Sequence, residues 1–171
     1  KKLFSSVFDT HKYLFADLDG TIIHTKSGRT FPKDKDDWVI DESVVEAIKN
    51  YDPEFLFIVS NQGGIEKGFV KTDDFIKKIT TILKDIQSMI PSLETSYRYC
   101  ASNDKTNKYR KPNPGMIEDL LDVYKCKKNQ CLMIGDASGK PSQFSDSDKI
   151  CAYKAGIGYM DVNDFIKKYG G

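Results

Sequence analysis

Residues 13–21 of this chain read Tyr-Leu-Phe-Ala-Asp-Leu-Asp-Gly-Thr, and this stretch decides the fold. Its first four residues form a short, continuous apolar run, which is typical of a strand buried on both faces of a sheet. The sequence then changes to acidic and turn-forming residues, as it does in an ordinary strand-to-loop turn. Asp17 and Asp19 lie two residues apart and point the same way, however, so their like charges need a cation or a proton beside them.

Further strands are predicted where apolar runs recur, at residues 55–59, 131–134, 97–100 and 158–160, the last two being the weaker signals. Helical patterns separate these runs. An amphipathic stripe runs from Phe75 to Met89, and Thr72 stands where a capping residue is expected. The pair Asn113-Pro114 indicates the start of another helix, with Asn113 as its cap. Shorter helices are predicted at residues 43–50, 149–155 and 162–169.

Strands and helices in alternation predict an α/β fold, a three-layer, Rossmann-like parallel sheet flanked by helices. The 171 residues suit one domain spanning 1–171, because no repeat or low-complexity linker divides them. In such sheets ligands bind outside the carboxyl ends of the strands. The residues that follow each strand are therefore the candidates for a functional site.

Composition and charge exclude some classes of protein. The formal net charge of +1 is unlike that of a basic tail, but it leaves nucleic acid open because clustering of Lys and Arg decides that binding. No apolar run approaches the ~20 residues that span a bilayer, and no secretory signal is visible. Four scattered cysteines without a C-x-x-C pair indicate reduced thiols in an intracellular protein, nuclear or cytoplasmic. We expect a monomer that does not bind membranes.

The other strand ends carry polar residues that suit a phosphate. Ser60 and Asn61 end one strand shortly before two glycines, and a hydroxyl with a glycine-rich backbone can donate hydrogen bonds to phosphate oxygens. Lys111 follows another strand and can neutralise a phosphoryl oxygen. Asp136 comes directly after the strand at 131–134 and Gly135, where it adds a third carboxylate. Hard cations such as Mg²⁺ take oxygen ligands and keep several waters, so two carboxylates and a carbonyl suffice.

The order D-x-D-G-T, S-N-Q, K-P and G-D resembles the haloacid dehalogenase-like (HAD-like) phosphotransferases across nearly the whole chain. Within that superfamily the resemblance narrows to the 3′-phosphatase domain of polynucleotide kinase-phosphatase. The longer strings that carry this narrower resemblance are TKSGRTFP at 25–32 followed by Asp37-Trp38, YRKP at 109–112 with Gly115-Met116, GDASGKP at 135–141, and Asp148 shortly before Cys151-Ala152. These strings are far more specific than the superfamily motifs.

The resemblance implies a role for each matching residue. Asp17 is the nucleophile that becomes a transient aspartyl-phosphate. Asp19 is the general acid, then the general base. Mg²⁺ is held by the carboxylates of Asp17 and Asp136 and by the backbone carbonyl of Asp19. The remaining expected site residues are Thr21, Ser60, Asn61 and Lys111 near the phosphate, with Thr21 also bracing the first loop, and Asp148 in a supporting role beside Lys111 or a metal-bound water.

The substrate expected from the resemblance is DNA that carries a 3′-phosphate at an end or a break, with other nucleic acids left open. The intervals after the first two motifs hold little beyond what the core needs, so no sizeable cap domain is predicted. An open site suits a polymer better than a small metabolite. Basic residues on the same rim could contact the nucleic acid backbone, although solvated lysine-rich loops are common. The chosen candidates are Arg29, Lys108, Arg110 and Lys140.

Two other functions stay open. A small-molecule phosphatase of the histidinol-phosphate or heptose-bisphosphate type is the first, although the similar relatives carry a Cys/His zinc loop before the K-P motif. Here residues 100–110 contain one Cys and no His. A catalytically silent module that binds DNA ends is the second, and the intact motifs argue against it. The chain has no G-x-x-x-x-G-K-[ST] loop, so we expect a stand-alone phosphatase or a fragment of a longer protein.

Overall fold

The computed structural model describes residues 11–171. Its centre is a five-stranded sheet in the order β5-β4-β1-β6-β7, in which every neighbouring pair is parallel. The strands are β1 (Tyr13–Ala16), β4 (Phe55–Asn61), β5 (Glu94–Cys100), β6 (Cys131–Gly135) and β7 (Gly158–Asp161). All five predicted strands are confirmed, and β5 begins three residues earlier than its weak apolar signal indicated. The first strand of the chain occupies the middle of the sheet.

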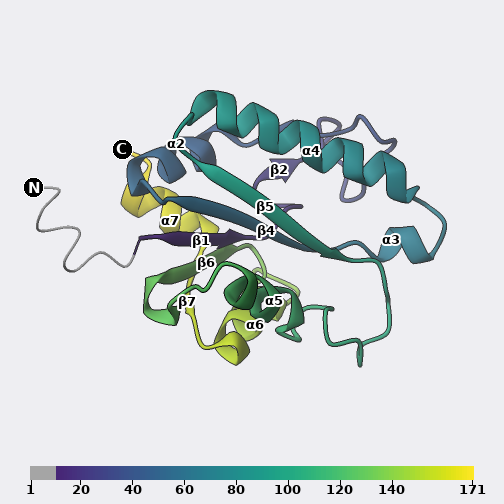
Figure 1. Ribbon diagram of the computed structural model, residues 1–171. Coiled ribbons are helices and arrows are strands. Elements are labelled where there is room, and N and C mark those ends of the chain that lie inside the picture. The colour runs from purple at the N-terminus through teal and green to yellow at the C-terminus, as the bar shows by residue number, and fades with distance from the viewer. Residues whose placement is uncertain (1–10) are drawn as a thin grey trace, which may run out of the picture.

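Helices cover both faces of this sheet (Figure 1). One face carries α2 (Glu42–Tyr51), α4 (Thr72–Met89) and α7 (Val162–Tyr169), and the other carries α5 (Gly115–Val123) and α6 (Ser147–Ala155). A short 3₁₀ helix, η1 (Lys128–Gln130), leads into β6. The predicted three-layer α/β architecture is therefore confirmed. None of the described helices is both long and apolar enough to cross a membrane.

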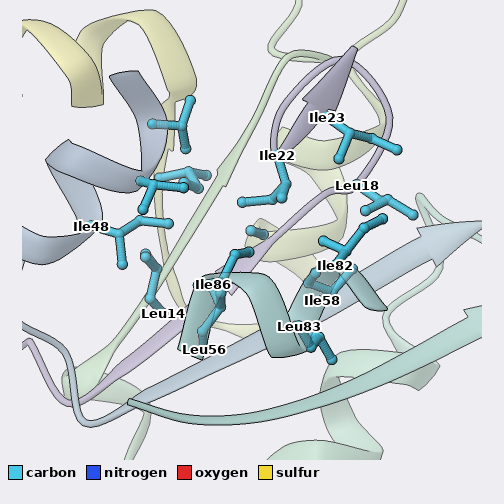
Figure 2. Close-up of a cluster of buried hydrophobic side chains, with 14 of the residues drawn as sticks. Leu14, Leu18, Ile22, Ile23, Ile48, Leu56, Ile58, Ile82, Leu83 and Ile86 are labelled. Carbon is cyan, nitrogen blue, oxygen red and sulfur yellow. The ribbon is translucent and has the colours of Figure 1, made fainter. Parts of the chain in front are cut away.

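Alternation along the strands explains why the sheet needs two helical layers. In β1, Leu14 and Ala16 belong to the core cluster under α2, α4 and α7, whereas Tyr13 and Phe15 belong to the cluster under α5 and α6. Strand β4 divides in the same way. Figure 2 shows the first cluster, where Leu14 and Leu56 of the sheet meet side chains of α2 and α4. Each fully buried side chain of this size stabilises the fold by roughly 1.5–3 kcal/mol.

A small two-stranded sheet lies between the D-x-D-G-T motif and β4, where only a helix and a loop were predicted. Its antiparallel strands are β2 (Ile23–His24) and β3 (Val39–Ile40). Two-residue strands are too short to produce a periodic signal, so the pattern could not reveal them. The interval adds no cap domain to the described part of the chain, in agreement with the sequence. Trp38 packs against the core cluster beside α2 and α4.

Two capping predictions were wrong. Thr72 is the first residue of α4 rather than its cap, and Lys71 precedes it without a side-chain cap bond. Asn113 does not cap α5, because its amide donates to the carbonyls of Lys105 and Asn107 and closes the preceding loop. A cap that the sequence did not single out is Asp41, which accepts hydrogen bonds from the backbone of α2. Short polar side chains suit caps and loop closures equally, so sequence position alone did not separate these uses.

Candidate active site

The order of the strands brings the candidate residues together. Strand β1 lies between β4 and β6, and all three end at the same edge of the sheet. Asp17 follows β1, Ser60 is near the end of β4, and Asp136 follows β6. Chain connections diverge to the two sides of β1 at this point, which is where open α/β sheets bind ligands.

Lys111 links the nucleophile candidate to a second, buried aspartate. Its Nζ atom lies 2.6 Å from Oδ1 of Asp17 and 2.8 Å from Oδ1 of Asp148. Lys111 is 4% exposed and Asp148 is 2% exposed, so both charges are removed from water. Buried charges persist in proteins when they are paired and hydrogen-bonded, and this lysine has two carboxylate partners. The arrangement agrees with the expectation that Asp148 supports Lys111.

Electrostatics in this cluster favour the arrival of a cation. Burial, and then the carboxylates of Asp148 and Asp136, raise the pKa of Asp17 well above its usual range, while Lys111 acts against them. Burial acts to lower the pKa of Lys111, but Asp17 and Asp148 outweigh it and raise that pKa above its usual value. The lysine therefore stays protonated. Burial, followed by the negative charges of Asp148 and Asp136, explains why the pKa of Asp17 rises in spite of its ion pair with Lys111.

Asp17, Asp136 and Asp148 each offer a carboxylate oxygen, and these three oxygens lie within 4.8 Å of one another. Such a set of oxygen donors fits a hard divalent cation. Burial, followed by the charge of Asp148, also raises the pKa of Asp136, although a hydrogen bond with Asp17 acts the other way. The carboxylate of Asp19 is not part of this cluster. The expected contribution of Asp19 is its backbone carbonyl, and that ligand stays a prediction.

Two glycines let the chain approach these acids closely. Gly20 has a φ of +80°, and a Cβ atom at this position would collide with the carboxylate of Asp136. A Cβ atom at Gly135 would lie 2.5 Å from Oδ2 of Asp148. Any larger residue at either position would push a carboxylate out of the cluster. Steric hindrance thus explains why glycine occupies these positions in the D-x-D-G-T and G-D motifs.

At the end of β4, the side chain of Asn61 contacts a neighbouring loop rather than an open phosphate site. Asn61 was expected near the phosphate, but its side-chain oxygen accepts from the Lys111 backbone N–H at 2.9 Å, and its Nδ2 donates to the Lys111 carbonyl at 3.0 Å. Both ends of this amide therefore hold Lys111 in place. Ser60 is buried at the same strand end, and the hydroxyl of Thr21 donates to Oδ2 of Asp17 at 3.4 Å. Thr21 thus braces the first loop.

Gln62 is a site residue that the sequence reasoning did not choose. Its Nε2 atom lies 2.9 Å from Oδ2 of Asp19 and 2.7 Å from Oγ of Ser60. Its place in the S-N-Q string was the signal that could have identified it, but only Ser60 and Asn61 of that string were chosen. Ser138 was also missed, and it joins the loop after Asp136 to Asp161 through a 2.6 Å hydrogen bond.

The four basic candidates are not equivalent. Arg29 and Lys108 are exposed, and the Lys108 ammonium lies 5.0 Å from the centre of the Tyr109 ring. Arg110 donates to the carbonyl of Ser102 at 3.2 Å. Lys140 is paired with Asp164 at 3.0 Å and lies 3.6 Å from Asp161, so its charge is already balanced within the protein. The structure therefore weakens the case for Lys140 more than for the others.

Solved structures share the fold of this chain. The chain is similar to a D,D-heptose 1,7-bisphosphate phosphatase from B. bronchiseptica, solved with magnesium and phosphate, with a TM-score of 0.68 and 20% identity over 86% of this chain and 78% of that one. It is also similar to a HAD-like phosphatase described as putative from Mesorhizobium loti, with a TM-score of 0.62 and 19% identity over 93% of this chain and 86% of that one. The shared fold, together with the sequence relatives below, makes this chain a HAD-type phosphatase.

The family is more specific. The model of the family described as polynucleotide kinase 3 phosphatase matches residues 12–166, and the chain belongs to this family. It is 34% identical over 165 residues to a bifunctional polynucleotide phosphatase/kinase from Schizosaccharomyces pombe, covering 92% of this chain and 38% of that protein. It is 28% identical over 164 residues to a heptose-1,7-bisphosphate 7-phosphatase from Campylobacter jejuni. This similarity covers 93% of this chain and 86% of that protein. The chain thus spans well under half of the yeast relative.

Proposed function

We propose that this chain removes 3′-phosphate groups from DNA ends and strand breaks, with Mg²⁺ as cofactor, as a step of DNA repair. The observation that carries the proposal is the Asp17–Lys111–Asp148 cluster, placed at an uncapped strand edge in a member of the polynucleotide kinase 3 phosphatase family. Similarity to the bifunctional polynucleotide phosphatase/kinase from Schizosaccharomyces pombe supports the same substrate class.

The chain's own groups supply the steps of the reaction. A carboxylate oxygen of Asp17 attacks phosphorus, and the bond from phosphorus to the departing 3′ oxygen breaks. Asp19 gives that oxygen a proton, then takes a proton from the water that hydrolyses the aspartyl-phosphate, so that phosphate leaves and Asp17 is restored. Lys111 holds Asp17 and offers positive charge to the phosphoryl oxygens. Bound Mg²⁺, held by Asp17 and Asp136, would neutralise charge on the phosphoryl group.

The surroundings of the site support a polymeric substrate. The described chain places no cap over the strand ends, and small metabolites usually need an enclosed pocket. Arg29 and Lys108 are exposed and available for phosphate contacts, and Tyr109 exposes 40% of its surface beside Lys108. Basic groups next to an aromatic ring are a common way to hold a nucleic acid strand.

A small-molecule sugar phosphate is the second candidate substrate. The similarity to the Campylobacter jejuni heptose-bisphosphate phosphatase, over 93% of this chain, favours it. Against it stands the loop at residues 100–110, which holds one cysteine and no histidine where the resembling small-molecule enzymes carry zinc ligands. The composition of this loop favours the DNA substrate.

A competition assay tests the proposal. A nicked duplex with a 3′-phosphate, its 5′-phosphate equivalent, a heptose 1,7-bisphosphate, histidinol phosphate and p-nitrophenyl phosphate are offered with Mg²⁺ or with chelator. We expect the 3′-phosphate duplex to be turned over fastest, and chelator to stop the reaction. Faster turnover of the heptose or histidinol ester would overturn the DNA assignment.

The Asp17→Asn variant tests the nucleophile in the same assay. It should lose turnover while DNA binding remains measurable, and Asp122→Asn on the exposed face of α5 is the matched control that should keep turnover. Wild-type protein that binds DNA ends but hydrolyses none of the esters would instead identify a silent binding module. Equal turnover in the Asp17→Asn variant would refute the assigned nucleophile.

A further inference from the structure

Asp19, the general acid of the proposed function, is an exposed side chain whose position needs a support. Its described hydrogen-bond partner is Gln62, whose Nε2 atom lies 2.9 Å from Oδ2. An exposed carboxyl on a loop samples several rotamers, and a misplacement of about 1 Å at a reacting group can cost roughly 100-fold in rate. A neighbour that fixes this carboxyl therefore affects the proton-transfer step directly.

Gln62 is well placed to act as such a support because its own backbone is fixed. Its N–H donates to the carbonyl of Cys100 at the end of β5, at 2.7 Å, and its carbonyl accepts from Ile65 in the short helix α3 (Gly63–Glu66). The next residue, Gly63, is held in turn by Asn103, whose Nδ2 donates to the Gly63 carbonyl at 2.9 Å. The amide of Gln62 thus extends from an anchored point toward Asp19.

The two hydrogen atoms of the Gln62 amide connect two functional groups. One is donated to Oδ2 of Asp19 and the other to Oγ of Ser60, at 2.7 Å. Because Oδ2 accepts a hydrogen bond, Oδ1 is the oxygen left to carry the catalytic proton. The oxygen of Ser60 accepts the other, and its own hydroxyl donates a long hydrogen bond of 3.5 Å to the Asn61 carbonyl, which an arriving phosphate oxygen can replace as acceptor. One amide therefore sets the direction of both groups.

We propose that Gln62 is a positioning residue that orients the Asp19 carboxyl, so that its proton faces the departing oxygen. This inference rests on the proposed function, since it requires Asp19 to be the general acid. If Gln62 positions Asp19, its loss should slow substrates with poor leaving groups more than substrates with good ones, whereas a purely structural role predicts the same loss on both. A leaving group that needs a proton depends on the orientation of Asp19, whereas p-nitrophenolate departs as a stable anion and needs little help.

The test compares kcat/KM of Gln62→Met on two substrates, a 3′-phosphorylated oligonucleotide and p-nitrophenyl phosphate. This ratio reports steps up to departure of the leaving group, so later hydrolysis of the aspartyl-phosphate does not enter it. Methionine keeps the length of the side chain and removes its donors. We expect a roughly 10- to 100-fold loss on the oligonucleotide and a loss of about 2-fold or less on the aryl ester.

Two further variants separate positioning from general loosening of the site. Asn103→Ala releases Gly63 and so weakens the anchor of Gln62, and it should lower kcat/KM more on the oligonucleotide than on the aryl ester, by a smaller factor than Gln62→Met does. In an Asp19→Asn background, Gln62→Met should lower kcat/KM on the oligonucleotide by about 2-fold or less, the part that passes through Ser60, because the carboxyl that it orients is gone. An equal loss on both substrates in Gln62→Met, or a full additional loss in the double variant, would overturn the inference. A wild-type protein inactive on both esters would overturn the proposed function itself.

Discussion

Lys111 is the residue on which the charge balance of the site depends. It is buried, and its ammonium is shared by the carboxylates of Asp17 and Asp148. Burying one charge costs several kcal/mol, but removing one partner of an existing buried pair costs more because it leaves the others uncompensated. The residue thus supports both the fold and the proposed chemistry.

Replacing this lysine should therefore affect stability as well as activity. Lys111→Met leaves the buried carboxylate of Asp148 and the partly buried carboxylate of Asp17 without their cation, and we expect a loss of about 3–5 kcal/mol in the free energy of unfolding, measured with urea in the presence of chelator. Mg²⁺ should recover part of this loss, because it supplies positive charge at the same place. Lys140→Met, in an exposed pair with Asp164, is the control and should cost much less. Equal losses in the two variants would contradict the balance described here.

At the scale of single elements, the loop between β2 and β3 is organised by Asp37. Its carboxylate accepts from the hydroxyl and the backbone N–H of Ser27, at 2.6 and 2.9 Å, and from the backbone N–H of Lys33 at 3.0 Å. These hydrogen bonds, with that from the Ser27 hydroxyl first, lower the pKa of Asp37 to about 2. The loop carries Arg29, a candidate DNA contact, so its order bears on substrate binding.

The lowered pKa gives this loop a defined dependence on pH. The folded-state pKa of about 2 lies below the ordinary value of 3.8, so the contribution to stability is complete above pH 3.8 and is lost as pH falls toward 2. Asp37→Asn should be less stable than wild type at neutral pH, and the difference should shrink across that acid window. Urea unfolding midpoints measured from pH 6 down to pH 2 check this. A difference that stays constant with pH would show that the carboxylate charge is unimportant.

The elements also show how far the sequence could predict the structure. Long apolar or periodic segments, such as β1, β4 and α4, were located correctly because burial on a sheet or a helix face imposes their pattern. The positions of the strand ends could be predicted from these segments. Because parallel strands end at one edge of the sheet, the proximity of Asp17, Asp136 and Lys111 could be predicted as well. The hairpin of β2 and β3 and the bridge made by Gln62 could not be predicted, because both depend on contacts between segments that leave no periodicity. The role of Asn61 could not be predicted either. An asparagine that binds phosphate and an asparagine that holds a loop have the same sequence signal.

For the whole molecule, a near-neutral chain concentrates negative charge at one point. The formal net charge is +1, yet Asp17, Asp136 and Asp148 converge at the centre of the sheet edge, where one ammonium, that of Lys111, pairs with Asp17 and Asp148. The three acids come from two strand ends and from α6, so only the folded sheet brings them together. A cation that binds this cluster therefore binds the native state and not the unfolded chain, and it must stabilise the fold as a whole.

This coupling predicts a measurable shift in thermal unfolding. With Mg²⁺ at 100 times its dissociation constant, the folded state should gain about 2.7 kcal/mol, which corresponds to a rise in Tm of roughly 5–10 °C for a chain of this size. Asp136→Asn removes one carboxylate of the cluster and should abolish most of this rise, whereas Asp122→Asn on the surface of α5 should keep it. The midpoints can be followed by circular dichroism with added Mg²⁺ or with chelator. An Mg²⁺-dependent rise of equal size in Asp136→Asn would mean that the ion binds elsewhere, and the assignment of the metal site would then fail even if the phosphatase activity is found.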